Sequence, residues 1–174
     1  MDSFWGNIFK KDRAAVRETL REVPMFRDLT DHELGCVERV LHRRQYMADE
    51  IIFSQGTLGA GMYIIVTGTV GILREPEGRE VAELSDGEFF GELALLEESA
   101  RPATAVARTP CKVLGFFQSD LFGLMERNPR LGSRIVMKLA RIIGRRLHLC
   151  NERTYGLEGE IATLRAELAR EEGV

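Results

Sequence analysis

The sequence predicts an α+β protein built around an antiparallel, jelly-roll-like β-roll. Of its 174 residues, 44% are apolar, which is enough for a hydrophobic core and too many for a disordered chain. Eight of the 17 glycines lie within the 36 residues from Gly56 to Gly91, a density typical of tight turns between short strands. After Pro129 there is no further proline, and apolar residues recur in heptads. The expected order is therefore N-terminal helices, a β-roll that contains one short helix, and a long C-terminal coiled-coil helix.

Two helices are expected before the roll. Apolar residues recur at helical spacing in two sets, first Val16, Leu20 and Val23, then Leu34, Val37 and Leu41. Pro24 separates the sets, and Thr30-Asp31-His32-Glu33 has the capping-box pattern that begins a helix. We assign residues 1–24 to an N-terminal helical segment.

The first 13 residues combine aromatic and basic side chains but lack the continuous apolar stretch of a signal peptide. A helix that docks on its own protein is the favoured interpretation, and a short interfacial membrane helix is the alternative. No apolar run approaches the roughly 18 residues needed to cross a bilayer. We therefore expect a cytoplasmic protein that makes no membrane contact.

The β-roll is predicted over residues 25–128. Six short, β-rich runs are separated by glycine or proline turns: 51–53, 62–66, 70–73, 81–84, 103–107 and 113–117. Strong helix formers at residues 92–97 follow Gly91 and predict a helical turn within the roll.

Residues 129–174 are predicted to form a dimerisation helix. The apolar seam is spaced 4, 3, 4, 3 throughout and consists of Val136, Ala140, Ile143, Leu147, Cys150, Thr154, Leu157, Ile161, Leu164 and Leu168. The pairs Arg153–Glu158 and Glu160–Arg165 fall at g and e positions, which favours a parallel homodimer. Gly156 and Gly159 predict some loosening of the coil. The alternative is a single helix that packs back on its own roll.

Charge and residue types exclude several functions. Charged residues make up 29% and the net charge is −3, so no general attraction to nucleic acid is expected. Arg141, Arg145 and Arg146 are interpreted as a solvated helix face, and we expect no DNA binding by this chain alone. No nucleophile is paired with a histidine base and no phosphate-binding Walker loop is present, so catalysis is not expected.

The cysteines and histidines do not predict a metal site. The three cysteines, Cys36, Cys111 and Cys150, are an odd number and form no CxxC pair, so they suggest neither a disulfide framework nor a zinc knuckle. The three histidines, His32, His42 and His148, are expected outside the strands, so a cupin-type metal centre is not predicted.

The most informative segment runs from Gly87 to Thr104. Gly91 is expected to open a short helix, whose first N–H groups are suited to an anion. Arg101 lies nine residues beyond Glu92 within the strand-rich region, where a guanidinium needs an anionic partner. Glu92 is suited to accept a hydrogen bond from a sugar hydroxyl or to pair with Arg101. Spacing alone leaves two interpretations open: a phosphorylated, hydroxyl-bearing ligand, or an Arg101–Glu92 ion pair that only holds the loop.

Phe90-Gly-Glu-Leu-Ala-Leu-Leu, followed after four residues by Arg101-Pro-Ala-Thr, resembles the phosphate-binding cassette of the cyclic-nucleotide-binding domain family. That family includes the bacterial catabolite activator protein, the regulatory subunit of cAMP-dependent protein kinase and cyclic-nucleotide-gated channels. The resemblance extends from about Met25 to Arg146, but no helix-turn-helix segment is recognised after the long helix.

The resemblance implies cAMP or cGMP as ligand, without a metal. Arg101 would pair with the cyclic phosphate, Glu92 would accept from the ribose 2′-hydroxyl, and Leu84 and Val66 would lie near the sugar or base. The residues implied in ligand binding are Gly91, Glu92, Leu93, Ala94, Arg101, Pro102, Ala103 and Thr104. The residue that caps the base is expected among Arg146, Leu147, Cys150 and Asn151.

Pro102 departs from the family pattern, which commonly has Ser, Thr or Ala after the arginine. Proline has neither a backbone N–H nor a hydroxyl, and a lost hydrogen bond to a charged group costs about 1.5–3 kcal/mol. The favoured function is a sensor that couples cyclic-nucleotide binding to the position of a dimer helix and acts on an unknown downstream protein. The alternative is a non-binding, dimeric interaction module with a degenerate cassette.

Overall fold

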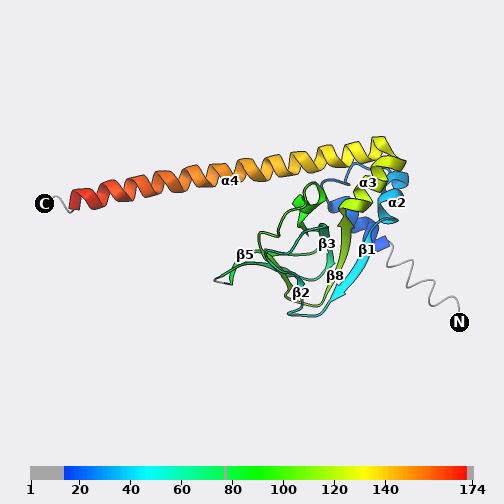
Figure 1. Cartoon of the computed structure of the whole chain (residues 1–174), viewed down its shortest axis with the longest axis horizontal. Helices are drawn as coiled ribbons and strands as arrows, with labels where there is room; N and C mark the ends of the chain where they lie inside the picture. The colour runs from blue at the N-terminus through cyan, green and yellow to red at the C-terminus, as the bar shows by residue number, and fades with distance from the viewer. Residues whose placement is uncertain (1–13, 77, 172–174) are drawn as a thin grey trace.

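The computed structural model describes residues 14–76 and 78–171, with the backbone alone for residues 166–171. It shows a β-roll with helices at one end and one long helix that runs across the roll and past it (Figure 1). The predicted α+β class is confirmed. The predicted aromatic helix at residues 1–13 lies outside the described residues.

The roll consists of two antiparallel four-stranded sheets. The first has the order β1-β8-β3-β6, and the second has the order β2-β7-β4-β5. The strands are β1 (His42–Tyr46), β2 (Ile51–Phe53), β3 (Gly61–Thr67), β4 (Val70–Arg74), β5 (Arg79–Leu84), β6 (Phe89–Phe90), β7 (Thr104–Ala107) and β8 (Cys111–Phe117). A one-turn 3-10 helix, η1 (Glu92–Leu95), follows β6, where the sequence predicts a helical turn.

Helices flank the roll. Residues 14–22 are helical, and α2 (Asp31–Glu38), α3 (Gln118–Arg127) and α4 (Pro129–Glu171) follow along the chain. The predicted capping box is present at the start of α2, where Thr30 accepts a hydrogen bond from the Glu33 N–H and Glu33 accepts one from the Thr30 N–H at 2.8 Å. Hydrogen bonding to the Thr30 backbone is the main reason that the pKa of Glu33 is lowered.

Two apolar clusters hold these elements together. The larger one joins the helices to the first sheet, and its fully buried side chains include Leu20, Phe26, Leu34, Phe116, Leu121, Ile135 and Leu139. The smaller one lies inside the roll and includes Ile65, Val70, Phe90, Ala105 and Val113. Because Ile135 and Leu139 belong to the larger cluster, the first half of α4 is fixed to the roll.

The sequence patterns did not predict three elements, namely the strands β1 and β6 and the helix α3. In β1, His42 to Gln45 are all exposed, so this edge strand lacks the apolar alternation that marks a half-buried strand. The expectation that His42 lies outside the strands is therefore wrong. Among the described residues, no cluster of three or more His, Cys, Asp or Glu could hold a metal ion.

The second half of α4 leaves the roll. The helix is continuous through Gly156 and Gly159, so those glycines do not interrupt it. Past Ile143 the apolar seam is solvent-exposed, with Leu147 at 60%, Leu157 at 59% and Ile161 at 48% of full exposure. The alternative in which the whole helix packs on its own roll is thus wrong for this half. The parallel pairing stays a prediction, and the side chain of its last seam residue, Leu168, lies outside the described part.

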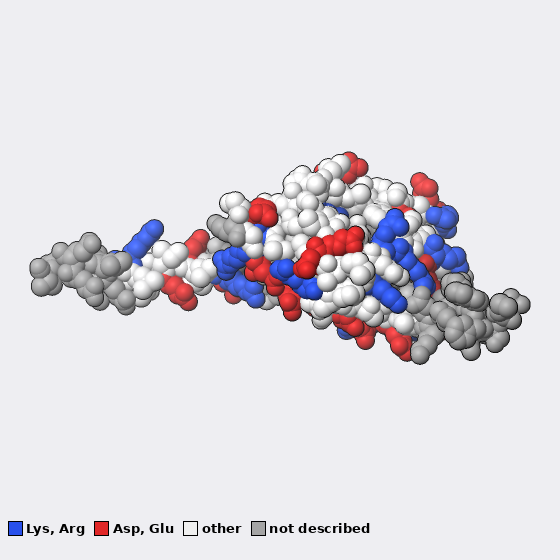
Figure 2. Space-filling model, turned by 90° about the horizontal axis from the view of Figure 1, so that it is seen from below, with Lys and Arg blue, Asp and Glu red and all other residues white. Residues whose placement is uncertain are grey.

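The surface carries charges of both signs. On the face in Figure 2, positive and negative side chains are interspersed rather than gathered into one large field of either sign. Cys36, Cys111 and Cys150 are all free thiols, and only Cys150 is exposed. Within residues 14–76 and 78–171, no helix has the length and apolar character that a membrane span requires.

Candidate functional site

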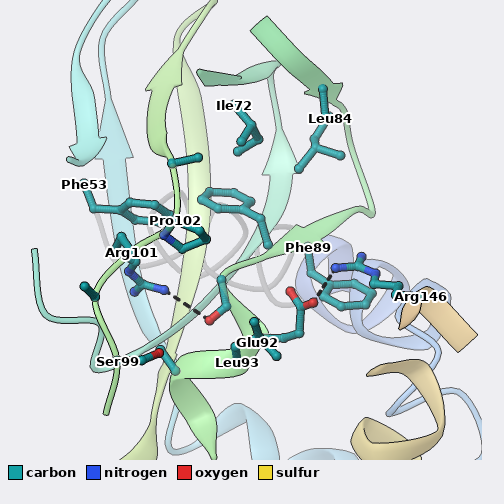
Figure 3. Close-up of a pocket in the computed structure, with 16 residues that line it drawn as sticks. Phe53, Ile72, Leu84, Phe89, Glu92, Leu93, Ser99, Arg101, Pro102 and Arg146 are labelled. Carbon is teal, nitrogen blue, oxygen red and sulfur yellow. Dashed lines mark hydrogen bonds and ion pairs between the residues drawn. The ribbon is translucent and has the colours of Figure 1, made fainter. Parts of the chain in front are cut away.

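A cavity of about 440 Å³ lies between the second sheet and the β6–η1 segment (Figure 3). Its volume falls within the range of about 300–1,000 Å³ that is usual for small-molecule sites. The wall residues are Phe53, Ile72, Ala82, Leu84, Phe89, Phe90, Gly91, Glu92, Leu93, Ala94, Ser99, Ala100, Arg101, Pro102, Ala103 and Arg146. They come from both sheets, from η1 and from α4, so only the folded chain assembles this cavity.

Arg101 is the buried cation of the cavity, with 7% of the residue exposed. Its Nη1 donates to the Gly91 carbonyl at 3.1 Å and its Nη2 donates to the Gly61 carbonyl at 2.6 Å. Its Cζ lies 4.1 Å from the centre of the Phe53 ring, a cation–π contact. Burial lowers the pKa of Arg101, although its guanidinium stays protonated at neutral pH.

The charge of Arg101 has no carboxylate partner within the described residues. Two backbone carbonyls use two of its five N–H donors, and the other donors are left for a further acceptor. A buried cation with no carboxylate in direct contact is unfavourable, because protein dipoles and the more distant charge of Glu92 replace only part of its hydration. The arrangement therefore favours an anion in this cavity.

Glycine is required at two positions beside Arg101. Gly91 has φ +76°, and a Cβ there would lie 2.5 Å from Nη1 of Arg101. A Cβ on Gly59 would lie 2.8 Å from the Cβ of Ala94 and 3.0 Å from Nε of Arg101. The backbone thus approaches the guanidinium more closely than any residue with a side chain would allow.

Glu92 is the buried anion of the cavity and pairs with Arg146 on α4. Nη1 of Arg146 donates to Oε1 of Glu92 at 2.5 Å, and the Glu92 side chain is only 9% exposed. The guanidinium of Arg146 also lies over the ring of Phe89, 4.9 Å from its centre. The alternative interpretation of an Arg101–Glu92 ion pair is therefore wrong: Arg146 is the partner of Glu92, and this contact joins the cassette to the long helix.

Most of the predicted ligand residues line the cavity. Gly91, Glu92, Leu93, Ala94, Arg101, Pro102 and Ala103 do so, and Leu84 and Arg146 join them. Thr104 is not among the wall residues, and its hydroxyl accepts a hydrogen bond from the Gln55 N–H at 2.9 Å. Val66 packs against the larger apolar cluster instead, so its predicted place near the sugar or base is wrong.

At the apolar end of the cavity, sequence reasoning predicted Leu84 but missed the other residues. Ile72 and Ala82 are paired across β4 and β5, and Phe53 comes from the far edge of the same sheet. No local motif marks these residues, because strand register alone brings them to the cavity. Ser99 was also missed, although it lies only two positions before Arg101.

The cavity has one polar end and one apolar end (Figure 3). Arg101, Glu92 and Ser99 form the polar end, whereas Ile72 and Leu84 form the apolar end, and Ala82 is paired with Ile72 across β4 and β5. This arrangement can hold a small anion that also carries a hydroxyl group and a flat or apolar portion.

Comparison with known proteins agrees with this geometry. Residues 43–128 match the family model for the cyclic nucleotide-binding domain. The chain is 36% identical over 121 residues to the cyclic AMP receptor protein of Thermus thermophilus, covering 68% of this chain and 56% of that protein. It is 32% identical over 148 residues to the cAMP-dependent protein kinase regulatory subunit of Mycosarcoma maydis, covering 84% of this chain and 26% of that protein.

A solved structure is similar as well. The crystal structure of the Thermus thermophilus catabolite activator protein superposes with a TM-score of 0.70 at 33% identity, covering 78% of this chain and 63% of that one. The chain therefore spans only part of these relatives, from about a quarter to a little under two thirds of their length.

Proposed function

We propose that this chain, which belongs to the cyclic nucleotide-binding domain family, is a non-catalytic regulatory protein that binds cAMP or cGMP in the cavity beside Arg101. The proposal rests mainly on the environment of Arg101. This residue is buried, it lines the cavity, it retains unused donors, and it has no carboxylate partner among the described residues. A cyclic phosphate supplies the missing negative charge.

The other wall residues fit the rest of a cyclic nucleotide. Arg146 engages Oε1 of Glu92, and Oε2 stays available to accept a hydrogen bond from a ribose 2′-hydroxyl. Gly91 and Ala94 lie beside the guanidinium, where backbone contacts to the sugar and phosphate are expected from the family resemblance. Ile72 and Leu84 offer an apolar surface to the base.

Binding is proposed to couple to the position of α4 through Glu92. A ligand hydroxyl on Glu92 shares this carboxylate with Arg146, so occupancy of the cavity and the placement of α4 depend on each other. Such coupling requires that the nucleotide have different affinities for two arrangements of the helix. The ion pair supports the proposal because it directly joins the cavity to the long helix.

The output is proposed to pass through a parallel homodimer along Val136 to Leu168 and then to a separate, unknown downstream protein. The exposed seam beyond the roll supports this, since isolated apolar stripes of such length need a partner. Sedimentation velocity tests it: wild type should sediment as a dimer, and Leu157→Glu as a folded monomer. A monomeric wild type at micromolar concentration would exclude the dimer.

A second candidate function is a dimeric interaction module that binds no nucleotide. The observation that favours it is that Arg101 already donates to two backbone carbonyls, so its side chain also holds β3 and the η1 turn together. Pro102 points the same way, because it removes one donor that a phosphate would use.

Isothermal titration calorimetry distinguishes the two candidates. The titrants are cAMP and cGMP, and the variants are Arg101→Gln and, as a matched control, Arg141→Gln on the exposed face of α4. Wild type and the control should bind, and Arg101→Gln should bind at least about 100-fold more weakly, since two charge-assisted hydrogen bonds are lost. No heat from wild type at millimolar nucleotide would refute the sensor and leave the interaction module.

A further inference from the structure

The polar end of the cavity contains one hydroxyl that the proposed contacts do not use. Ser99 lines the cavity and is half-buried, and within the described part of the chain its hydroxyl forms no hydrogen bond. A hydroxyl that is free, partly removed from water and placed in a ligand cavity is a ready donor to a ligand oxygen.

The backbone directs Ser99 and Arg101 to the same side. Residues 99–101 run extended beside residues 56–59: the Gly59 N–H donates to the Ser99 carbonyl at 3.0 Å, and the Arg101 N–H donates to the Thr57 carbonyl at 2.8 Å. Leu58 and Ala100 form the bridge between these two bonds. Side chains alternate along an extended segment, so Ser99 and Arg101, two positions apart, share a face.

The figure agrees with this placement. Ser99 and Arg101 lie together on one side of the cavity, and Leu84 and Arg146 lie across from them (Figure 3). A phosphate held by Arg101 is therefore on the same side of the cavity as the Ser99 hydroxyl. The two hydrogen bonds on either side of Ala100 fix the backbone that carries Ser99, so the ligand need not order this segment when it binds.

Pro102 follows Arg101 directly and lines the same cavity as Ser99. The residue after the arginine provides no N–H and no hydroxyl here, whereas the family pattern commonly has Ser, Thr or Ala, so a phosphate at Arg101 lacks one donor that the family pattern offers. We infer that Ser99 is a phosphate-binding residue of this chain, and that its hydroxyl supplies the hydrogen bond that Pro102 removes. This inference rests on the proposed function, because it assigns a donor within the same nucleotide site.

A double-mutant cycle between Ser99 and Pro102 tests the inference by calorimetry with cAMP and cGMP. In the wild-type background, Ser99→Ala should weaken binding by about tenfold or more, as expected for one hydrogen bond to a charged acceptor, and Ser99→Thr should retain most of the affinity. In the Pro102→Ser background, which restores an N–H and a hydroxyl, Ser99→Ala should cost clearly less. Ser133→Ala, at an exposed serine of α4, is the control and should bind as wild type does.

The outcomes separate this inference from the function on which it rests. If wild type binds a cyclic nucleotide and Ser99→Ala binds equally well, Ser99 is not a ligand donor and the proposed function still stands. If Ser99→Ala costs the same in the wild-type and the Pro102→Ser backgrounds, the two positions act independently and compensation is refuted. If wild type binds neither nucleotide, both the proposed function and this inference are refuted.

Discussion

Replacing Gly91 by alanine tests whether the backbone beside Arg101 is built around the guanidinium. Gly91 has φ +76°, so an alanine there is strained by about 1–2 kcal/mol. In addition, its Cβ would lie 2.5 Å from Nη1 of Arg101, which must then leave the Gly91 carbonyl. The loss of that charge-assisted hydrogen bond adds about 1.5–3 kcal/mol. Gly91→Ala should therefore lower the free energy of unfolding by about 2.5–5 kcal/mol in total.

Gly78→Ala is the matched control for this prediction. Gly78 has φ +60° and nothing within 4 Å of the added Cβ, so it reports the backbone strain alone. Urea unfolding followed by circular dichroism should show Gly91→Ala to be less stable than Gly78→Ala by about 1.5–3 kcal/mol. A difference below about 0.5 kcal/mol would show that the close approach to Arg101 carries no energetic weight, and the reasoning would be refuted.

Three further predictions concern charge and assembly. A hydrogen bond from Lys138 is the main cause that lowers the pKa of Asp28 below 3.8, so the ionised carboxylate stabilises the fold above that pH and this stability is lost as the pH falls further. Asp28→Asn should therefore flatten the loss of stability in urea midpoints measured between pH 5 and 3. An acid profile identical to that of wild type would contradict this prediction. A double-mutant cycle of Glu92→Gln and Arg146→Gln should give a coupling energy of about 0.5–1 kcal/mol in the free energy of unfolding, because the exposure of Arg146 limits the strength of the pair. A coupling energy of zero would show that the pair does not hold α4 against the cassette. In a parallel, in-register dimer, two copies of Cys150 face each other at a d position. Mild oxidation should therefore give a disulfide-linked dimer on a non-reducing gel, and Cys150→Ser should abolish this dimer. An oxidised wild type that stays monomeric would argue against that register.

Local patterns predicted the parts of the fold that local physics determines. The capping box at Thr30 and Glu33 and the turn after Gly91 depend on neighbours within a few residues, and both are present. β1 escaped prediction because a polar edge strand buries almost nothing and so carries no apolar alternation. α3 escaped because it continues directly from β8 with no glycine or proline between them.

In the candidate site, too, residues close together in the sequence were predicted, and residues brought together only by folding were not. The cassette places Gly91, Glu92 and Arg101 within one short segment, so the sequence alone was enough to single them out. The partner of Glu92 was not predictable, because Arg146 lies 54 positions further along the chain and only the packing of α4 brings it there. The Phe53 ring under Arg101 likewise depends on strand pairing rather than on spacing.

A crystal structure of the chain grown with saturating cAMP, and a second grown with cGMP, would test most directly whether Arg101 is the phosphate receptor. The proposed function predicts nucleotide in the cavity, with a phosphate oxygen within hydrogen-bond distance of the Arg101 guanidinium and the ribose 2′-hydroxyl on Glu92. A vacant cavity at millimolar nucleotide, with Arg101 still bound only to the carbonyls of Gly61 and Gly91, would contradict it.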